Sequence, residues 1–569
     1  MPTEDVSSLL EQLSARVADL ERRLATLEHP SQAHSSPLES PAAPAIINPG
    51  PGGALSAQPQ PGVFSIFGRA VLGIAGAYVL RAAAESGAIP SWMAVTLALA
   101  YAAGWLTWAA WPRTQTQLAR ASYAITAALI LAPMLWEVTV RFRILDPPVT
   151  AGVLAAFALL AMTLAWRRDV YSVIWVGTLT AVITALILMA ATRAPVPFTL
   201  TLISIALLSE FAASQGRWLA LRMVVAAAAD FAALVLIIIL GNSRAVPPEY
   251  HPVSAGLMIG LVAALFAIYA VSLVTRSLIL RLKITAFEAA QFAITVLLTG
   301  WAALRITDGA ALPALGVSCL IAGVACYFAA FGLLARHCER PNFHFYSACG
   351  VAFVMAGSFF ALPSFPLAIW LCLAAVIATG LGVRVRSPAL DLHGVVYLAG
   401  AVFASGLLAY AGRALAGTYP PAPGALPIVA AVAALLCTAM GSRYPGERQG
   451  ERLLRLLPAI LAVYAIAALA VAALVWFVAR GAAPAPPQLA VIRTIVTCAA
   501  ALLLAFVGAR WKRTELVWMA YAAAVLGSLK LVFEDLRFGT TQSLAVSLLI
   551  YGTVLILIPR LVRAGKRLA

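Results

Sequence analysis

Long runs of apolar residues, separated by short polar segments, make up most of this chain. From Phe64 onward each run has about twenty residues, enough to cross a hydrocarbon core of roughly 30 Å at about 1.5 Å per residue. The pattern predicts about eighteen membrane-spanning helices. They lie near 64–84, 90–111, 118–140, 147–166, 170–192, 196–213, 218–240, 253–275, 284–304, 312–335, 343–362, 364–383, 389–412, 424–441, 453–478, 489–509, 515–536 and 540–559. We therefore expect an all-α fold, with a polytopic transmembrane helix bundle over residues 63–569.

Residues 1–29 show a different pattern. Apolar residues recur alternately at steps of four and three, which is the seam of a coiled coil. They are Val6, Leu10, Leu13, Val17, Leu20, Leu24 and Leu27. A seam this short is marginal for an isolated helix, so we expect self-association or a protein partner through the coiled coil Leu10–Leu27. The alternative is an amphipathic helix that is solvated or lies on the membrane surface.

Residues 30–62 are rich in proline, alanine and serine and almost free of charge. The segment holds eight prolines. It cannot bury enough apolar area to offset the entropy of ordering its backbone. We therefore expect a disordered linker that tethers the N-terminal helix to the bundle.

The amino-acid composition indicates that lipid surrounds the predicted helix bundle. The chain has 569 residues, of which 62% are hydrophobic and 11% charged, against about 25% charged for soluble domains. Such a surface requires the lipid bilayer as its partner. The net charge of +16 does not indicate nucleic acid, because the basic residues sit in short loops between apolar runs and form no single patch.

The basic residues alternate in density from loop to loop. Loops after every second predicted span hold most of them, for example Arg167–Arg168, Arg384–Arg386 and Arg443–Arg455. By the positive-inside rule these loops face the cytoplasm. Both termini are then cytoplasmic, in a multi-pass protein of the cell inner (plasma) membrane. The N-terminus is acidic and polar and shows no cleavable signal, so we expect the first span to direct insertion.

The chain carries no strong signature of catalysis. Patterns GxxxxGK[ST], GxSxG and HExxH are absent, as is any CxxC among the seven cysteines. His337, Cys338 and His344 contain possible metal ligands, but their spacing matches no zinc pattern. We therefore expect no catalytic, cofactor-binding or metal-binding residues, and the balance is against an enzyme.

Several polar residues fall inside predicted spans, where charges are costly and often functional. One polar stripe follows helical spacing: Glu288, Gln291, Thr295 and Thr299. It either lines a water-filled path or joins two helices by hydrogen bonds. Asp230 is mid-span without a local partner, so it is a candidate buried carboxyl, protonated or paired, with a possible proton-relay role.

Two shorter patterns have local interpretations. Glu137 and Arg141 stand at i and i+4, which favours an ion pair on one helix face. Asp391 and His393 are two positions apart and so lie on different faces, which weakens any acid–base pair.

The stretch Trp518–Phe538 combines an apolar span with charges near one end. Lys530 and Glu534 stand at i and i+4 and are expected to pair. Asp535 points about 100° away from Glu534 around the helix, so it is free to meet another helix.

Two stretches resemble one family. VLGSLKLVFEDL (525–536) resembles the closing motif of the domain of unknown function 2339 family of bacterial membrane proteins, in which a lysine precedes an aspartate by five positions. FGRAVLGIAGAYVLRAAAESGAIP (67–90) resembles that family's first span. The family often has an arginine at the start of the second span, where this chain has Met93 and Ala94. The resemblance implies the architecture of coiled coil, linker and many spans, and no biochemical activity.

The two motifs end at the same predicted membrane face. We therefore predict one intramembrane polar cluster, with Arg81 against Asp535 or Lys530 against Glu85. Its members are Arg81, Glu85, Lys530, Glu534 and Asp535.

The sequence leaves three functional hypotheses open. The first is a non-enzymatic inner-membrane protein, a transporter-like or envelope scaffold component. The alternative is an integral-membrane transferase or polymerase acting on lipid-linked envelope substrates, although the sizeable external loops common in such enzymes are missing from the predicted topology. The third is an assembly platform that recruits a partner through its coiled coil. A continuous polar cavity favours the first two, and a solid apolar bundle favours the third.

Overall fold

The computed structural model describes residues 61–86, 88–111, 116–217, 219–241, 246–335, 340–417, 422–441, 449–480, 484–511 and 513–567. The chain divides into two units, Met1–Phe64 and Ser65–Ala569, and nearly all described residues belong to the second. The predicted coiled coil and most of the predicted linker lie outside the described residues. The last two linker residues, Pro61 and Gly62, already belong to the first described helix.

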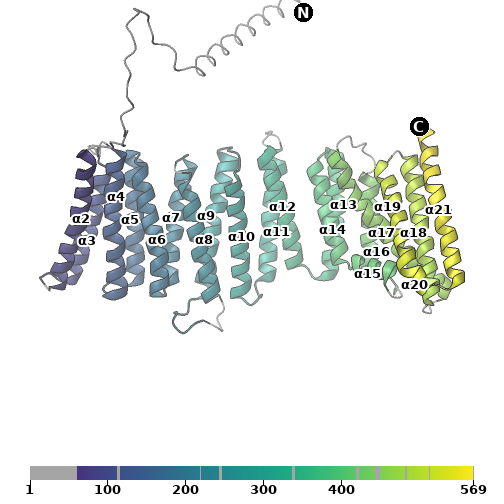
Figure 1. The fold of residues 1–569 in the computed structure, drawn as a ribbon, viewed down its shortest axis with the longest axis horizontal. Helices are drawn as coiled ribbons and strands as arrows, with labels where there is room; N and C mark the ends of the chain where they lie inside the picture. Colours follow the sequence, from purple (N-terminus) through teal and green to yellow (C-terminus); the bar gives the residue numbers. More distant parts are fainter. Residues whose placement is uncertain are drawn as a thin grey trace, which may run out of the picture. The chain divides into compact units, whose positions relative to one another are not determined.

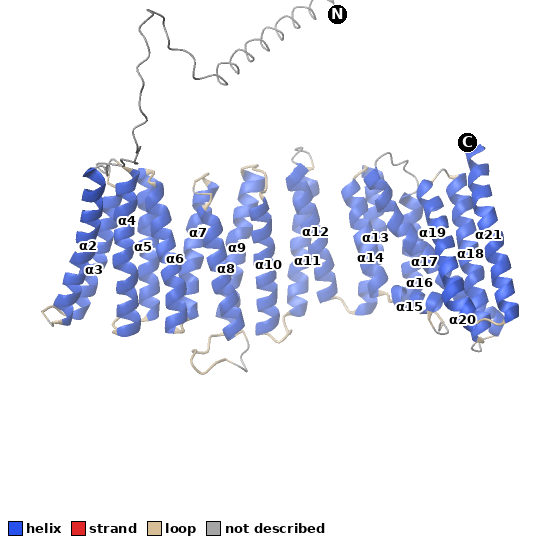
Figure 2. Ribbon diagram, viewed as in Figure 1, coloured by secondary structure: helices blue, strands red, loops and turns tan. Residues whose placement is uncertain are grey.

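Every regular element in the described ranges is helical (Figure 2). The α-helices are α2 (Pro61–Glu85), α3 (Ser91–Ala109), α4 (Gln117–Trp136), α5 (Pro147–Arg168), α6 (Tyr171–Thr192), α7 (Pro195–Ser214), α8 (Leu221–Leu240), α9 (Ala255–Val274), α10 (Ala286–Ile306), α11 (Leu312–Tyr327), α12 (Arg340–Ala361), α13 (Ser364–Val385), α14 (Pro388–Ala404), α15 (Leu407–Ala416), α16 (Ala425–Gly441), α17 (Gln449–Ala479), α18 (Pro486–Arg510), α19 (Thr514–Lys530), α20 (Leu536–Phe538) and α21 (Thr541–Arg567). Four π-helical segments interrupt or end them: η1 (Glu137–Arg141), η2 (Thr275–Ile279), η3 (Phe328–Leu334) and η4 (Leu531–Asp535). The all-α fold is therefore confirmed.

Each apolar run predicted from the sequence coincides with a helix or with consecutive helical segments. Among the described residues, 15 helices are long and apolar enough to cross a membrane, or 16 if the bent pair α14 and α15 is one span. The 17 residues of α16 make a shorter apolar helix, and α2 is not among the 15. The structure thus supports a multi-pass membrane protein, while the count of eighteen stays a prediction.

The predicted span 389–412 is not straight. Its two halves, α14 and α15, meet at an angle of 68°. Gly406 stands at the break with φ of 71°, in the left-handed region that glycine adopts without a steric penalty. The hydroxyl of Ser405 accepts a hydrogen bond from the amide of Leu407. The bend therefore has a local backbone cause.

Neighbouring helices pack through small residues. Sequence neighbours such as α11 and α12, or α13 and α14, lie side by side (Figure 1). A Cβ added to Gly316 would stand 2.7 Å from the backbone nitrogen of Ala361, and one added to Gly357 would stand 2.8 Å from the carbonyl oxygen of Gly316. Such close backbone approach is typical of helix pairs in lipid, where dispersion contacts drive association.

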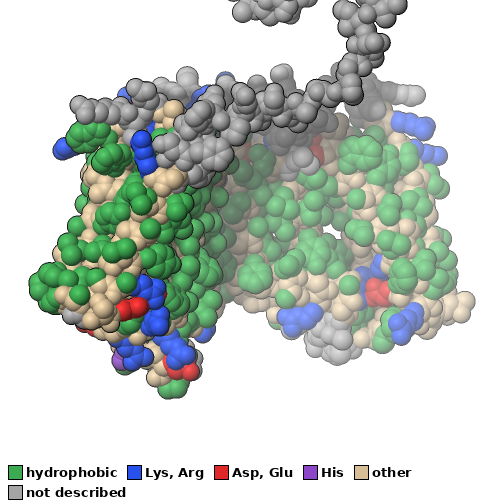
Figure 3. Space-filling model, turned by 60° about the vertical axis from the view of Figure 1, so that its left-hand side comes forward, with side chains coloured by type: hydrophobic (Ala, Val, Ile, Leu, Met, Phe, Trp, Pro, Cys, Tyr) green, Lys and Arg blue, Asp and Glu red, His purple; other side chains and the backbone are tan. Residues whose placement is uncertain are grey.

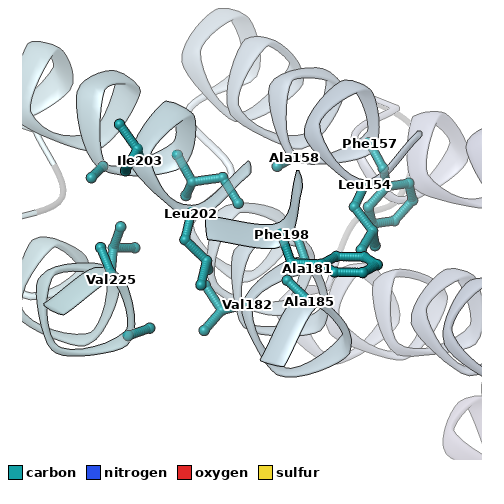
Figure 4. Packing of buried hydrophobic residues seen from close by; sticks show 14 of the residues in the cluster. Leu154, Phe157, Ala158, Ala181, Val182, Ala185, Phe198, Leu202, Ile203 and Val225 are labelled. Carbon is teal, nitrogen blue, oxygen red and sulfur yellow. The ribbon is translucent and has the colours of Figure 1, made fainter. Parts of the chain in front are cut away.

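The largest buried cluster joins the helices from α3 to α10. Figure 4 shows part of it, where Leu154 and Phe157 of α5, Ala181 of α6 and Phe198 of α7 converge. Leu154, Ala181 and Phe198 are each fully buried. This cluster places the neighbouring polar side chains of α7, α8, α9 and α10 in fixed positions.

The outer surface of the helices is apolar. Large side chains such as Trp476, Phe477 and Leu549 are 69%, 76% and 73% exposed. Figure 3 shows hydrophobic side chains covering the visible helix faces, with most lysines and arginines near the helix ends. An apolar band bounded by charges is the surface that a bilayer covers, so lipid contact follows from the structure.

Candidate functional site

A group of four charged side chains is buried where α7, α8, η2 and α10 meet. We call Glu210, Arg222, Arg276 and Glu288 the ion network; each is at most 7% exposed. Arg222 donates to Glu210 and to Glu288, both at 3.1 Å. Arg276 donates to the same Glu288 oxygen at 2.5 Å. Two positive and two negative charges balance, so the network is neutral as a whole.

Further hydrogen bonds hold the carboxylates of the ion network. Ser272 of α9 donates to Glu210 at 2.5 Å. The second oxygen of Glu288 accepts from the amide and hydroxyl of Thr285, at 2.8 and 3.0 Å, and this forms a capping box at the start of α10. Buried ion pairs stabilise only when such bonds satisfy the remaining lone pairs. The ion network meets that condition and links four helices.

Asp230 and the predicted polar stripe, identified separately in the sequence, meet in the structure. The side-chain amide of Gln291 donates to the two carboxylate oxygens of Asp230 at 3.0 and 2.8 Å. Asp230 is half-buried, and Gln291 and Thr295 are buried. Thr299 contacts α9 by donating to the carbonyl of Val262 at 3.5 Å. The stripe therefore joins α10 to α8 and α9 by hydrogen bonds, one of its two predicted roles.

A tyrosine lies near both the ion network and Asp230. Tyr269 is 4% exposed and stands one helical turn before Ser272 on α9. It is close enough to interact electrostatically with Glu210, Arg222 and Asp230. Its hydroxyl makes no hydrogen bond to another described residue. A buried hydroxyl without a partner is costly in apolar surroundings.

The helical stripe of polar residues and the charge density of the loops do not reveal most of the ion network. Arg222 and Arg276 stand near the ends of the predicted spans 218–240 and 253–275, where charges are common, although both side chains are buried in the bundle. Glu210 falls within the apolar run 196–213 and belongs to no polar stripe. A lone glutamate inside such a run is the signal that could have found the network, because it requires a partner.

The charges of the closing motif form a second group, in which Asp535 is buried and Lys530 and Glu534 are half-buried. Lys530 contacts Asp535 at 2.5 Å and Glu534 at 3.8 Å. Asp535 is 2% exposed and also accepts from Thr494 of α18 and Ser547 of α21. The predicted pair of Lys530 and Glu534 is confirmed, and Asp535 does meet other helices.

Arg493 completes this group, and no sequence pattern singles it out. It is 2% exposed and donates to Glu534 at 2.6 Å. It also donates to the backbone carbonyls of Arg413, Ala414 and Gly417 at 3.1, 2.8 and 2.7 Å. These carbonyls close the carboxyl end of α15, where partial negative charge gathers. Arg493 thus ties the bent half-helix to the closing motif.

The charged residues of the stretch 67–90 do not pair with those of the closing motif. Arg81 contacts Glu85 at 3.0 Å and Glu137 of η1 at 2.6 Å. The predicted pairings of Arg81 with Asp535 and of Lys530 with Glu85 are thus replaced by pairings within each motif's own neighbourhood. The physical reason is that each motif finds its counter-charge on an adjacent segment. The predicted pair of Glu137 and Arg141 is present at 4.0 Å, longer than the contact with Arg81.

A neutral polar chain joins α11, α12 and α14. The ring of His393, 3% exposed, contacts the hydroxyls of Tyr327 at 3.0 Å and Ser347 at 3.1 Å. Tyr327 continues the chain to Tyr397 at 2.7 Å. A serine–histidine contact acts in hydrolysis only together with an oriented carboxylate and an oxyanion site.

The described part of the chain contains no group of three or more His, Cys, Asp or Glu that could hold a metal ion. Of the possible metal ligands named from the sequence, His337 and Cys338 lie outside the described residues. Comparisons with protein-family models, with curated proteins and with solved structures found no match. Membership of the domain of unknown function 2339 family therefore stays a prediction from the two motifs.

Proposed function

We propose that this chain is a transporter-like membrane protein in which Asp230 binds and releases a proton. The observation that supports this is the position of the carboxylate. Asp230 is the tenth of the 20 residues of α8, about 14 Å from either helix end at a rise of about 1.5 Å per residue. An ionisable residue at such depth is a functional candidate, and carboxylates there often belong to proton relays.

The surroundings of Asp230 suit a group that changes its charge. Its direct partner is the neutral amide of Gln291, whereas Glu210 and Glu288 are each held by an arginine. An arginine fixes a carboxylate in its ionised form through a strong Coulomb attraction. No arginine or lysine of the described ranges forms an ion pair with Asp230, so the loss of its charge would break no ion pair.

Further polar side chains lie toward one end of the bundle from Asp230. Tyr269 lies near both Asp230 and the ion network, and Ser272 follows one turn later on α9. The ion network stands at the helix ends beside Arg217 and Arg281, on the side that the basic loops predict to be cytoplasmic. A proton that leaves Asp230 toward that side would pass hydroxyl and carboxylate oxygens.

Proton movement in proteoliposomes tests this proposal. The full chain is reconstituted with a trapped pH-sensitive dye, and a potassium gradient with valinomycin sets an inside-negative potential. The lumen should acidify faster than in protein-free liposomes, and Asp230→Asn should remove the difference. Asp169→Asn is the matched control, because that side chain is 90% exposed and lies at a helix end. Equal rates with and without protein would contradict the proposal.

The other hypotheses make different predictions for the same sample. A scaffold would leave the proton rate at the liposome background and would co-purify with a partner bound through residues 1–29. A transferase acting on lipid-linked substrates would modify such a lipid independently of the potential. We further propose, from the loop charges and the two motifs, an inner-membrane location with cytoplasmic termini. These points rest on the sequence.

A further inference from the structure

We propose that the cavity between α2, α3 and the end of α4 binds one phospholipid with a primary ammonium headgroup. The cavity holds about 430 Å³, within the roughly 300–1,000 Å³ of ligand cavities. Its walls include the apolar residues Ile74, Ala94, Ala98 and Ile130. Tyr78 also lines it and is 62% exposed, so the cavity opens on the lipid-facing surface.

The length of the cavity corresponds to one leaflet of a bilayer. On α2 its lining residues extend from Ile74 to Glu85, which is eleven steps of about 1.5 Å, or roughly 16 Å. Half of a hydrocarbon core is about 15 Å. The charged residues are all at one end, where α2 ends and the membrane surface is expected. An acyl chain therefore fits along the walls with its headgroup at the charged end.

The charges at that end select the headgroup. Arg81, Glu85 and Glu137 line the cavity, and the one guanidinium contacts both carboxylates. Arg141 contacts Glu137 at 4.0 Å, so two positive and two negative charges balance here and suit a headgroup that carries both charges. The Arg141 side chain is 62% exposed and does not line the cavity, so Arg81 and the two carboxylates are the charges that line the headgroup end. A phospholipid that carries an ammonium beside its phosphate can pair with a carboxylate and with the planar fork of Arg81 at once.

Photolabelling of the purified full chain in detergent tests the site. The probe is phosphatidylethanolamine with a photoreactive diazirine in one acyl chain, and labelled peptides are identified by mass spectrometry. Label should concentrate on α2, α3 and α4. Unlabelled phosphatidylethanolamine should compete about tenfold better than phosphatidylglycerol, the difference expected for one charged hydrogen bond.

Two pairs of variants separate the tail from the headgroup. Ala98→Trp fills the cavity and should remove the label, whereas Leu97→Trp, at an exposed neighbour outside the cavity, should keep it. Glu85→Gln with Glu137→Gln should make the two lipids compete equally. Glu249→Gln, at an exposed ion pair elsewhere, should not.

Three results would overturn the inference. The first is label spread evenly over the lipid-facing helices. The second is competition by phosphatidylglycerol or by a polyprenyl phosphate that equals that of phosphatidylethanolamine. The third is a cross-link between two protein chains at this face. If Ala98→Trp does not elute as a folded monodisperse protein, the glutamine variants decide alone.

Discussion

Lys530 and Asp535 are five positions apart on one helix, and their side chains meet at 2.5 Å. In an α-helix, five steps of about 100° would turn the two side chains about 140° apart. The backbone from Leu531 to Asp535 is π-helical, with i→i+5 hydrogen bonds that bring residues five apart onto one face. The spacing in the closing motif therefore has a backbone explanation.

Other π-helical segments of the chain also carry charged residues. Of the four described π-segments, η1 carries Glu137, η2 carries Arg276 and η4 carries Glu534 and Asp535. Each of these segments forms an ion pair with another segment through one of these residues. Because π-helical turns are rare and occur often at functional sites, their coincidence with the intramembrane charges indicates that the backbone is adapted to place them.

Asp535→Asn should destabilise the bundle strongly. It leaves the ammonium of Lys530, whose side chain is 14% exposed, without its closest counter-charge, and breaking a buried pair costs about 3–5 kcal/mol. The double variant with Lys530→Met should recover part of that loss, because no unpaired charge remains. The measurement is reversible unfolding in mixed micelles. Glu249→Gln breaks an ion pair whose partners are each 53% exposed and should cost less than about 1 kcal/mol. Equal losses for both pairs would refute the buried role.

Gly316→Ala should separate α11 from α12. The new Cβ would stand 2.7 Å from the backbone nitrogen of Ala361, which cannot move without the helix. Overpacking of this kind costs about 1–3 kcal/mol, seen as a lower melting temperature of the purified protein. Gly260→Ala is the control, because nothing lies within 4 Å of its added Cβ. The control should melt at the wild-type temperature or above it, since alanine favours the helix.

Asp230 should react with an apolar carbodiimide, which modifies protonated carboxyl groups within the membrane. Protonation rises as the pH falls, so the labelled fraction should rise as the pH of the labelling buffer is lowered. Glu288 should label far less, because two arginines hold its ionised form. Peptide mass spectrometry distinguishes the two sites. Labelling of Glu288 above Asp230, or labelling of Asp230 that does not change with pH, would contradict its proposed role.

The helices could be predicted from the sequence, because the thickness of the bilayer dictates the length of each apolar run. The side-chain contacts between different helices could not be predicted in this way. Arg222 and Glu288 are 66 positions apart, and nothing in either neighbourhood encodes the contact. The bend at Gly406 could not be foreseen because glycine is common in straight membrane helices as well. Asp230 and the stripe from Glu288 to Thr299 could be found because polar residues stand out in apolar runs, but their contact required the fold.

Arg493 should be irreplaceable by lysine. Its guanidinium donates to Glu534 and to three backbone carbonyls at the end of α15. A lysine keeps the charge, but its three donors on one nitrogen cannot reproduce the planar fork that spans these acceptors. Arg493→Lys should therefore leave carbonyls of α15 unsatisfied and loosen this half-helix, with amide exchange in Leu407–Ala416 rising about tenfold for each roughly 1.4 kcal/mol lost.

The effect of Arg493→Lys should be local. Hydrogen exchange followed by mass spectrometry should show the increase in α15 and in η4, while α5 keeps its wild-type rate. Arg510→Lys changes an exposed arginine at the other end of α18 and should alter neither region. If Arg493→Lys protects α15 as well as the wild type does, charge alone holds the half-helix. In that case Arg493→Met, which removes the charge, should release it.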